Sequence, residues 1–333
     1  MIHIGALHLR LGNAKAVGAL LKEKESKPMK KAQFLTPVVT AFDAEGNLDQ
    51  QANKDIYDHL IRGGVDGLVV MGSTGEFFSM PEAQKKQLID LVVSHVNHRT
   101  KVYIGTACMN VEDTIHLSNY AIDAGADGVM IVSPYYFALS DDSIESYFDQ
   151  VAESVKGDIY LYNFPARTAH DLSPEVTLRL LRKHRHIKGY KDTVTEMAHT
   201  RKLIQTVQPE FPDFIIYSGF DENFAHNVLS GGNGCIGGLS NIYPEVFSAW
   251  AKAANAHDYQ QVAAIQTIVD KMMELYDIGT PFIPIVKQAM MLKGIKMQGF
   301  CTKPFLQPDS KQTAAIQALL QEIDARIARS AVI

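Results

Sequence analysis

The sequence predicts an α/β fold, a (β/α)8 TIM barrel with a helical subdomain at its C-terminal end. From Phe34 onward, short β-type runs alternate with amphipathic helical stretches. Two junctions repeat almost literally, Gly63-Gly-Val-Asp-Gly-Leu-Val-Val70 and Ala124-Gly-Ala-Asp-Gly-Val-Met-Ile131. Glycine past a helix end permits a left-handed cap, after which a buried strand begins at once. Eight such units within about 220 residues favour a closed barrel, and an open doubly wound sheet is the lesser alternative.

Each strand is expected where an apolar, β-branched run ends in a loop of small or polar residues. The expected strands are Phe34–Thr40, Asp66–Met71, Lys101–Gly105, Asp127–Val132, Asp158–Tyr162, Ile187–Lys191, Phe214–Ser218 and Gly234–Gly237. The helical stretches between them include Leu48–Arg62, Pro81–Val96, Val111–Ala124, Asp141–Val155 and Pro174–His184. The later helices are Pro244–Ala256, Tyr259–Tyr276, Pro281–Lys293 and Lys311–Ile327.

Three regions follow from this order. Residues 1–28 are polar and carry the charge-mixed run Lys22-Glu-Lys-Glu-Ser-Lys27. They contain no apolar core of signal-peptide length, and their glutamates argue against a transit peptide. We therefore expect residues 1–30 to be an N-terminal extension, with Met29 as the natural beginning of the protein. Residues 31–255 are expected to form the catalytic barrel and residues 256–333 the C-terminal helical subdomain.

Composition excludes several classes of protein. The chain has 333 residues, is 46% hydrophobic and has a formal net charge of -5, without a basic stripe. A large core is therefore expected, and nucleic acid is not an expected partner. The longest apolar runs are far shorter than the roughly 20 residues of a membrane span. Three scattered cysteines provide neither a disulfide framework nor a zinc spacing, which favours the reducing cytoplasm.

The strongest chemical signal is a tyrosine and a lysine at the ends of two successive strands. Alternation along a strand places Tyr162 on the same face as Tyr160, and Lys191 on the same face as Gly189. If both strands line one barrel, Tyr162 and Lys191 converge near its rim. Desolvation in a closed apolar site favours the free amine of a lysine, which attacks a ketone to form a Schiff base. A nearby tyrosine hydroxyl can carry protons for that chemistry.

Other polar groups follow the remaining strands, and the C-terminal rim of such a barrel is where chemistry occurs. The turn Gly72-Ser-Thr-Gly-Glu76 exposes backbone N–H groups that can hold a carboxylate. Ser133-Pro-Tyr-Tyr136, Arg167 and Ser218-Gly-Phe-Asp-Glu222 follow later strands. Arg167 offers a carboxylate clamp. Each group alone has an ordinary structural explanation, such as loop packing or a surface ion pair. Their occurrence together on one rim supports a site.

A metal-dependent aldolase is the alternative mechanism for the same reaction, and it would need histidine and carboxylate ligands. The chain has 12 histidines. The pairs His95/His98 and His184/His186 fall on expected helices or loops at the far side, where exposed histidine is ordinary. No metal or other cofactor is therefore expected.

With these residues in place, the chain from about Lys31 to its C-terminus resembles the dihydrodipicolinate synthase / N-acetylneuraminate lyase superfamily, whose members are pyruvate-dependent, Schiff-base barrels. The motifs that carry the resemblance are Gly-Ser-Thr-Gly-Glu (72–76), Pro-Tyr-Tyr (134–136), Tyr-Asn-Phe-Pro-Ala-Arg-Thr (162–168) and Gly-Tyr-Lys-Asp-Thr (189–193).

The resemblance implies a role for each matching residue. Lys191 would form the Schiff base and Tyr162 would shuttle protons, with Ser73 and Tyr136 as its relay partners. Tyr136 would reach into a neighbouring subunit of a homotetramer. Ser73 and Thr74 would hold the pyruvyl carboxylate, and the carbonyl group of Ile236 would border the site.

The motifs disagree about the substrate. Arg167 resembles the arginine with which dihydrodipicolinate synthases grip aspartate semialdehyde. Ser73, Thr193 and the segment Gly219-Phe-Asp-Glu222 resemble the sugar-acid branch, as in 2-keto-3-deoxy-gluconate aldolases. In that branch the threonine and the acidic pair, here Asp221 and Glu222, bind substrate hydroxyls. The serine expected 17 residues after the aspartate in neuraminate lyases is Gly238 here, which weakens neuraminate itself. We expect a lyase or aldolase acting on a 2-keto-3-deoxy sugar acid or a related hydroxylated keto acid.

Two alternatives stay open. The first is a dihydrodipicolinate synthase that condenses pyruvate with aspartate semialdehyde. The second is a barrel that binds a keto acid without turnover, as a regulator. A pure binding protein has no use for a nucleophile, so Lys191 together with Tyr162 favours an enzyme.

Overall fold

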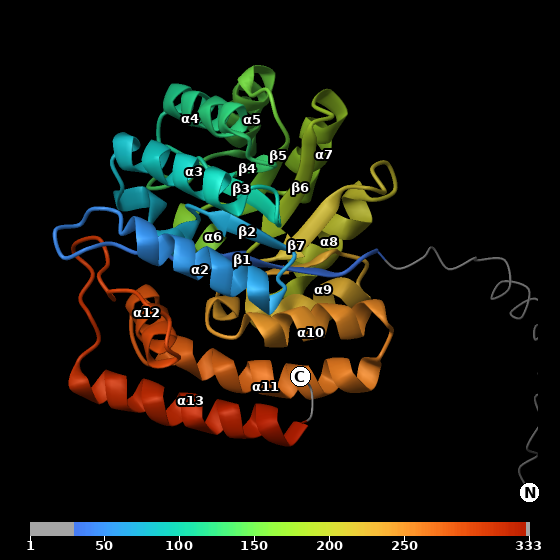
Figure 1. Ribbon diagram of the computed structural model, residues 1–333. Helices are drawn as coiled ribbons and strands as arrows, with labels where there is room; N and C mark the ends of the chain where they lie inside the picture. The colour runs from blue at the N-terminus through green and yellow to red at the C-terminus, as the bar shows by residue number, and fades with distance from the viewer. Residues whose placement is uncertain (1–29, 331–333) are drawn as a thin grey trace, which may run out of the picture. The chain divides into compact units, whose positions relative to one another are not determined.

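The computed structural model describes residues 30–330, which form a closed barrel of eight parallel strands (Figure 1). The strands follow one another around the barrel in sequence order, and β1 pairs with β8 to close it. They are β1 (Gln33–Pro37), β2 (Gly67–Val70), β3 (Lys101–Gly105), β4 (Gly128–Val132), β5 (Ile159–Asn163), β6 (Ile187–Asp192), β7 (Ile215–Ser218) and β8 (Gly234–Ile236). The barrel prediction is confirmed. The doubly wound alternative is wrong, because an open sheet would leave β1 and β8 at separate edges.

Helices connect the strands. They are α2 (Gln50–Gly63), α3 (Glu82–Val96), α4 (Val111–Ala124), α5 (Asp141–Ser154), α7 (Pro174–Lys183), α8 (Met197–Val207), α9 (Phe224–Leu229) and α10 (Pro244–Asn255). Short helical turns lie in the loops after several strands: η1 (Ser73–Gly75), η2 (Phe77–Ser79), α6 (Pro165–Thr168), η3 (Asp221–Asn223) and η4 (Gly238–Asn241). The expected strand that began at Phe34 stops at Pro37 rather than Thr40. Val38 N–H still donates to the carbonyl oxygen of Val69 on β2 at 2.9 Å, but Val39 N–H turns to Asn241 Oδ1 at 3.2 Å, so the ladder ends there.

The repeated junctions have a structural reason. Gly64 and Gly125 cap α2 and α4 with φ of +83° and +108°, a left-handed conformation that suits glycine. The aspartate two residues later then accepts the N–H of the preceding strand: Asp66 Oδ2 from Phe34 and Asp127 Oδ2 from Val102, each at 2.9 Å. The junction before β8, Gly231-Gly-Asn-Gly-Cys-Ile236, is a looser copy, and there Asn233 Oδ1 accepts the N–H of Ile216 at 3.0 Å. Each copy therefore ties one strand to the next.

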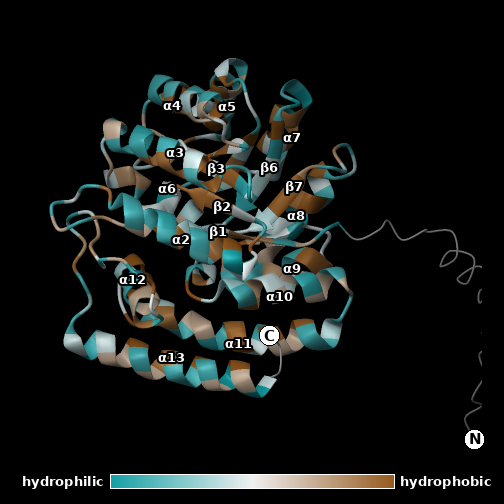
Figure 2. Ribbon diagram, viewed as in Figure 1, coloured by the Kyte–Doolittle hydropathy of each residue, from teal (hydrophilic) through white to brown (hydrophobic). Residues whose placement is uncertain are grey.

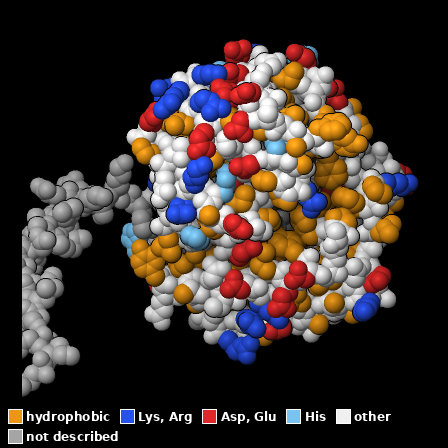
Figure 3. Space-filling model, turned by 180° about the vertical axis from the view of Figure 1, so that it is seen from behind, with side chains coloured by type: hydrophobic (Ala, Val, Ile, Leu, Met, Phe, Trp, Pro, Cys, Tyr) orange, Lys and Arg blue, Asp and Glu red, His pale blue; other side chains and the backbone are white. Residues whose placement is uncertain are grey.

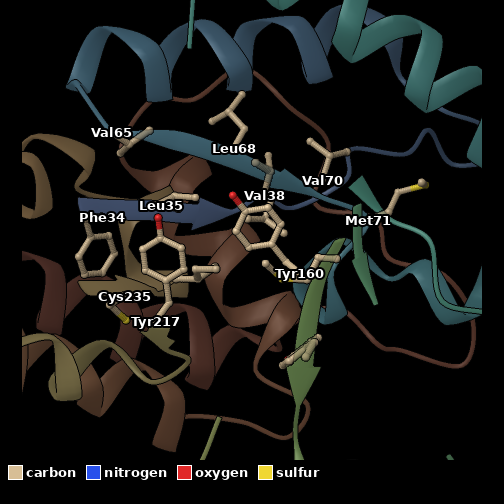
Figure 4. Packing of buried hydrophobic residues seen from close by; sticks show 14 of the residues in the cluster. Phe34, Leu35, Val38, Val65, Leu68, Val70, Met71, Tyr160, Tyr217 and Cys235 are labelled. Carbon is tan, nitrogen blue, oxygen red and sulfur yellow. The ribbon is translucent and has the colours of Figure 1, made fainter. Parts of the chain in front are cut away.

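The core extends from the barrel interior to the surrounding helices. In Figure 2 the strands are mostly brown, whereas the helices carry teal residues, as expected for strands buried on both faces. Figure 4 shows Tyr160 and Tyr217 packed close to Leu35 and other apolar side chains. Phe34 and Phe247 have ring centres 4.4 Å apart, which joins β1 to α10. Lys191 on β6 is a charged exception among these buried residues, with 5% exposure.

The C-terminal residues form the predicted helical part. It consists of α11 (Tyr259–Asp277), α12 (Ile283–Leu292) and α13 (Ser310–Ser330). Helix α11 packs against α10 and α13, and α12 contacts η4 (Figure 1). Residues from Lys31 onward form one compact unit, so this helical part extends the barrel. The expected extension over residues 1–28 lies outside the described residues.

The surface seen in Figure 3 carries acidic and basic side chains interspersed with hydrophobic ones. No continuous basic stripe is visible on this face. Within residues 30–330, none of the helices combines the length and the apolar character needed to cross a membrane.

Candidate active site

Lys191 and Tyr162 lie side by side at the C-terminal ends of β6 and β5. They are register partners in the parallel ladder, so their side chains point the same way. Both are buried, and Lys191 Nζ lies 4.4 Å from the centre of the Tyr162 ring. The expected convergence of an amine and a phenol is present. Gly189, two register pairs earlier, makes room for Tyr160, because a Cβ at Gly189 would lie 2.5 Å from that ring.

A small cavity lies in front of this pair at the ends of β2 to β6. Its lining residues are Val69, Met71, Gly72, Phe77, Gly105, Ala107, Met130, Val132, Tyr162 and Lys191. Tyr162 and Lys191 carry the polar side chains of this lining. A Cβ on Gly105 would lie 2.0 Å from the carbonyl oxygen of Met71, so only glycine fits there. An apolar cavity with one amine and one hydroxyl suits the predicted Schiff-base chemistry.

The turn after β2 brings a hydroxyl to the same place. Ser73 Oγ lies 3.5 Å from the Tyr162 hydroxyl, at the outer limit of a hydrogen bond. Thr74 is 5% exposed. Thr40 Oγ1 donates to the carbonyl oxygen of Gly75 at 2.9 Å, which fixes the turn against β1. The carboxylate-binding role of Ser73 and Thr74 stays a prediction.

Glu76 closes this turn and is held by a residue that sequence reasoning missed. Its Oε1 lies 2.5 Å from Lys287 Nζ on α12, and both side chains are 0% exposed. Lys287 Nζ also donates to the carbonyl oxygen of Phe300 at 2.7 Å. Glu76 Oε2 accepts the N–H and the Oγ1–H of Thr302, at 2.6 and 2.8 Å. The C-terminal helical part thus holds the turn that carries Ser73.

Tyr136 is present at the rim but does not line the cavity within the described residues. It sits in the loop after β4 with φ of +97° and 83% exposure. Its ring packs edge-on against Phe137, with centres 5.0 Å apart. The predicted relay from Tyr162 to Tyr136 therefore does not form within the cavity lining of one chain. Its expected place in a neighbouring subunit stays a prediction.

Arg167 lies on α6, beside the pair. Its guanidinium carbon lies 5.7 Å from the centre of the Phe164 ring. Phe164 in turn stacks on Tyr162, with centres 6.1 Å apart. The side chain is exposed, so its N–H groups face solvent at the rim. A cation placed there could meet an anionic end of a substrate, as the sequence predicts.

Two candidate substrate ligands retain unpaired atoms. Thr193 Oγ1 and Glu222 Oε2 are both buried without a hydrogen-bond partner in the described structure. Burial raises the pKa of the Glu222 carboxyl. Buried polar groups are normally paired, and an unpaired one calls for an explanation. A substrate hydroxyl could supply the partner for Thr193, which lies two residues past Lys191.

Asp221 and Ile236 lie at the same end of the barrel, but, unlike Thr193 and Glu222, they offer no unpaired side-chain atom to a substrate. The Asp221 carboxylate accepts the N–H groups of Gly238 and Leu239, at 3.1 and 3.0 Å, and the Tyr276 hydroxyl at 2.9 Å. Burial raises its pKa to about 7 against the effect of these bonds. Its internal partners hold η4 in place, which sequence reasoning did not foresee. Ile236 is fully buried on β8 and does not line the described cavity.

Sequence reasoning also missed polar residues directly behind the pair. Asn163 follows Tyr162, and Asp192 follows Lys191. Both are buried and hydrogen-bonded to each other, with Asn163 Nδ2 donating to Asp192 Oδ1 at 3.1 Å. Asp192 stands in the motif Gly-Tyr-Lys-Asp-Thr (189–193), but its partner His199 belongs to the next helix and to no motif. Over residues 30–330, no three His, Cys, Asp or Glu side chains group as a metal site would require.

A comparison with family models matches residues 30–323 to the dihydrodipicolinate synthetase family. Among relatives, the "Putative 2-dehydro-3-deoxy-D-gluconate aldolase YagE" of Escherichia coli K12 is 36% identical over 290 residues, 87% of this chain and 96% of that protein. The "Probable 2-dehydro-3-deoxy-D-pentonate aldolase YjhH" of the same strain is 32% identical over 287 residues, 86% of this chain and 95% of that protein.

A solved structure agrees with these relatives. The crystal structure of YagE from Escherichia coli K12 in complex with pyruvate has a TM-score of 0.86 and 35% identity. It covers 88% of this chain and 98% of that chain. A 4-hydroxy-tetrahydrodipicolinate synthase of Bacillus velezensis is also similar, with 32% identity over 289 residues, 86% of this chain and 98% of that protein.

Proposed function

The chain belongs to the dihydrodipicolinate synthetase family, and on this premise we propose that it makes or breaks a carbon–carbon bond through a Schiff base between Lys191 and a 2-keto acid. It is a lyase of the class I aldolase type. The observation that carries the assignment of Lys191 is its buried amine, 4.4 Å from the centre of the Tyr162 ring in an apolar cavity.

The first step is imine formation. The free amine of Lys191 attacks the ketone carbon of pyruvate or another 2-keto acid, and the carbinolamine that results loses water. The protonated imine withdraws electrons from the neighbouring carbon, C3. The small cavity supports this step because it holds the ketone carbon next to the buried amine and leaves little room for water.

The second step breaks the bond between C3 and C4 of a 2-keto-3-deoxy acid. The C4 hydroxyl loses its proton, the C3–C4 electron pair moves into the imine, and an aldehyde leaves. Tyr162 moves this proton, with Ser73 Oγ 3.5 Å away as its relay. The enamine then takes a proton at C3, and water releases pyruvate from Lys191. In the reverse direction, the same steps join pyruvate to an aldehyde.

The turn after β2 binds the carboxylate of the keto acid in this proposal. Ser73 and Thr74 stand in a 3-10 turn next to the cavity, and such turns present N–H groups to anions. The Glu76–Lys287 pair supports this role by fixing the turn at its far end.

A 2-keto-3-deoxy sugar acid is the favoured substrate. Two relatives above 30% identity carry names of aldolases for such acids. The unpaired Thr193 Oγ1 is the feature of this chain that a substrate hydroxyl would satisfy. Asp221 contributes less to this proposal than the sequence suggested, because its carboxylate has internal partners. Glu222 remains the acidic candidate at this rim.

A second candidate is synthesis of 4-hydroxy-tetrahydrodipicolinate from pyruvate and aspartate semialdehyde. The exposed Arg167 guanidinium beside Phe164 favours it, because it could grip the carboxylate of the semialdehyde. A similar relative carries that name. A keto-acid-binding regulator without turnover explains neither the buried amine nor the adjacent phenol.

The adduct is tested first. The protein is incubated with pyruvate and borohydride, digested and analysed by peptide mass. A reduced pyruvyl group on Lys191 is expected, and Lys188 on the same strand provides an internal control because it is exposed. Absence of the adduct, or labelling elsewhere, would refute the mechanism. Retained activity after EDTA treatment is expected, whereas loss with recovery on added zinc would favour a metal-dependent aldolase.

Two variants separate the substrates. The Arg167 side chain is exposed at the rim, where a charge-assisted hydrogen bond to a substrate carboxylate contributes about 1.5–3 kcal/mol. Arg167→Leu should therefore lower the use of aspartate semialdehyde in a synthase by roughly 10–100-fold and weaken a sugar-acid aldolase less. Thr193→Ala should weaken a sugar-acid aldolase more than a synthase, because it leaves a substrate hydroxyl without its hydrogen-bond partner. Each variant is incubated with pyruvate and a panel of aldehydes, and the mass of the products shows which aldehydes it still uses. Normal turnover by both variants would place the acceptor pocket elsewhere.

Assembly as a homotetramer in the cytoplasm completes the proposal. Tyr136 and Phe137 are 83% and 74% exposed, and paired aromatic side chains on a surface favour contact with another chain. The three cysteines are free, as a reducing compartment would keep them. Sedimentation of the purified protein tests the assembly, and a monomer at working concentrations would contradict it.

A further inference from the structure

A polar network lies behind the Lys191–Tyr162 pair, on the outer face of the barrel wall, with the Asp192 side chain buried and the Asp171 side chain 42% exposed. Asn163 and Asp192 each follow one residue of the pair, so strand alternation turns their side chains away from the cavity. Asn163 Nδ2 donates to Asp192 Oδ1 at 3.1 Å and to Asp171 Oδ1 at 2.8 Å. One amide group therefore links two carboxylates.

His199, near the start of α8, joins the same two carboxylates from the other side. Its Nδ1 lies 2.8 Å from Asp192 Oδ2, and its Nε2 forms an ion pair with Asp171 Oδ2 at 3.0 Å. The second contact is not aligned for a hydrogen bond. Only the imidazolium form presents an N–H group to both carboxylates. Burial lowers the pKa of His199, but the interactions with the carboxylates of Asp171 and Asp192 outweigh burial and raise the pKa to about 10.

The charged and polar side chains around His199 have partners that are compatible with its contacts to Asp171 and Asp192. Lys202 on α8 pairs with Glu175 on α7 at 2.9 Å, and Thr200 Oγ1 donates to Asp192 Oδ2 at 2.6 Å. Burial raises the pKa of Asp171, but its interactions with His199 and Asn163, and then the charge of Lys202, outweigh burial and lower that pKa. The two carboxylates and one imidazolium carry a net charge of about −1, which the structure holds behind the amine of Lys191.

We infer that His199 is a positioning residue, which bridges Asp171 and Asp192 and thereby holds the ends of β5 and β6 where Tyr162 meets Lys191. The inference rests on the proposed function and adds a residue to it. Thr193 N–H donates to the carbonyl oxygen of Asn163 at 2.9 Å, so the two strand ends are tied directly beside the pair. Without the cation, two carboxylates that share the Asn163 amide repel each other.

Small displacements of reacting groups are costly. A misplacement of about 1 Å can lower a rate roughly 100-fold. His199 is not among the residues that line the cavity, so we expect its removal to act on the reaction through the positions of Tyr162 and Lys191. A purely structural role would lower stability and leave the rate of imine formation in the folded protein unchanged.

Three variants test the bridge. His199→Asn keeps a neutral donor near Asp192 but removes the cation. His199→Asn combined with Asp171→Asn removes one positive and one negative charge, so it restores the net charge of the network. His184→Asn is the matched control, because His184 forms a similar pair with Asp149 at 2.8 Å before β6, at the opposite end of the strand.

The readout is the rate at which pyruvate and cyanoborohydride label Lys191 in folded protein, measured beside the melting temperature. The single variant should label at least about tenfold more slowly, and the charge-balanced double variant should recover most of that loss. The control should label within about twofold of the wild type, since its network lies far from the pair. Labelling of the single variant at the wild-type rate would overturn the inference.

Crystal structures distinguish this failure from that of the proposed function. If wild-type Lys191 takes no pyruvyl group, the proposed function is wrong, and the inference is judged on geometry alone. Lys191 Nζ lies 4.4 Å from the Tyr162 ring centre in the intact network. A wider or shifted separation in His199→Asn supports the inference. An unchanged separation, with the contacts to both carboxylates lost, overturns it.

Discussion

Lys287→Met removes the cation from the buried pair that holds the Ser73 turn, and its effect follows from the contacts. Lys287 Nζ binds Glu76 Oε1 and the carbonyl oxygen of Phe300, and lies 5.0 Å from the centre of the Phe42 ring. Methionine has a similar length and fills the same space. The variant therefore isolates the loss of charge and of two hydrogen bonds from the loss of volume.

The expected cost is large because the carboxylate left behind has no access to water. Both side chains of the pair are 0% exposed. Breaking a buried pair by removal of one partner costs about 3–5 kcal/mol. Glu76 retains only the two donors of Thr302, which compensate part of its charge. For a chain of this size, we expect the melting temperature to fall by roughly 5–15 °C.

The assay is thermal and urea unfolding, with pyruvate KM measured in parallel. Since Glu76 closes the turn that holds Ser73 and Thr74, KM for pyruvate should rise in the protein that stays folded. Combining Glu76→Gln with Lys287→Met removes both charges and should destabilise less than Lys287→Met alone.

Lys293→Met is the matched control from the same region. Lys293 pairs with Asp324 at 2.8 Å, with side chains 29% and 47% exposed. Such a pair is worth about 0–1 kcal/mol, so its loss should barely change the melting temperature. If Lys287→Met costs no more than this control, the buried pair does not hold the turn and the reasoning is refuted.

Further predictions concern the pair itself, its cavity and the network behind it. Tyr162→Phe deletes only the hydroxyl and should lower turnover by about 10²–10⁴-fold, and a loss under roughly tenfold in steady-state kinetics would assign the proton to another group. Gly105→Ala should cost about 1–3 kcal/mol in unfolding free energy and slow labelling of Lys191, since its Cβ would meet the Met71 carbonyl; unchanged stability would contradict this. The raised pKa of His199, from 6.5 when unfolded to about 10 when folded, contributes stability that is fully present below pH 6.5 and lost as the pH rises through about 10. Melting curves from pH 6 to 10.5 should show this loss in the wild type and not in His199→Asn.

Local pattern was sufficient to predict the pair at the centre of the site. Strand alternation gave the faces of Tyr162 and Lys191, and the repeated junctions predicted the parallel neighbours that bring them together. Both inferences use residues a few positions apart. The barrel itself follows from the same short-range repetition.

Partners distant in sequence could not be predicted. Glu76 was visible as part of a motif, but Lys287 lies 211 residues away on a helix without any matching signal. Asp221 was expected to face a substrate, and the sequence contains no sign that the N–H groups of Gly238 and Leu239 turn toward it. His199 is an ordinary helix residue until the fold places it between two carboxylates. The fold, rather than any motif, creates these contacts.

Side-chain hydrogen bonds join the strands in pairs at the floor of the barrel, which is the end where the strands begin, opposite the rim. They divide the barrel into modules of two strands. Asp66, Asp127 and Asn233 tie β1 to β2, β3 to β4 and β7 to β8 through a side chain. Before β6, His186 instead gives its backbone carbonyl to the N–H of Ile159, and the register of β5 and β6 shifts there. The module β5–β6 has its side-chain tie at the rim, between Asn163 and Asp192. A protein engineer could therefore exchange the floor ends of the other three modules for one another, whereas β5–β6 carries its tie at the same end as Tyr162 and Lys191.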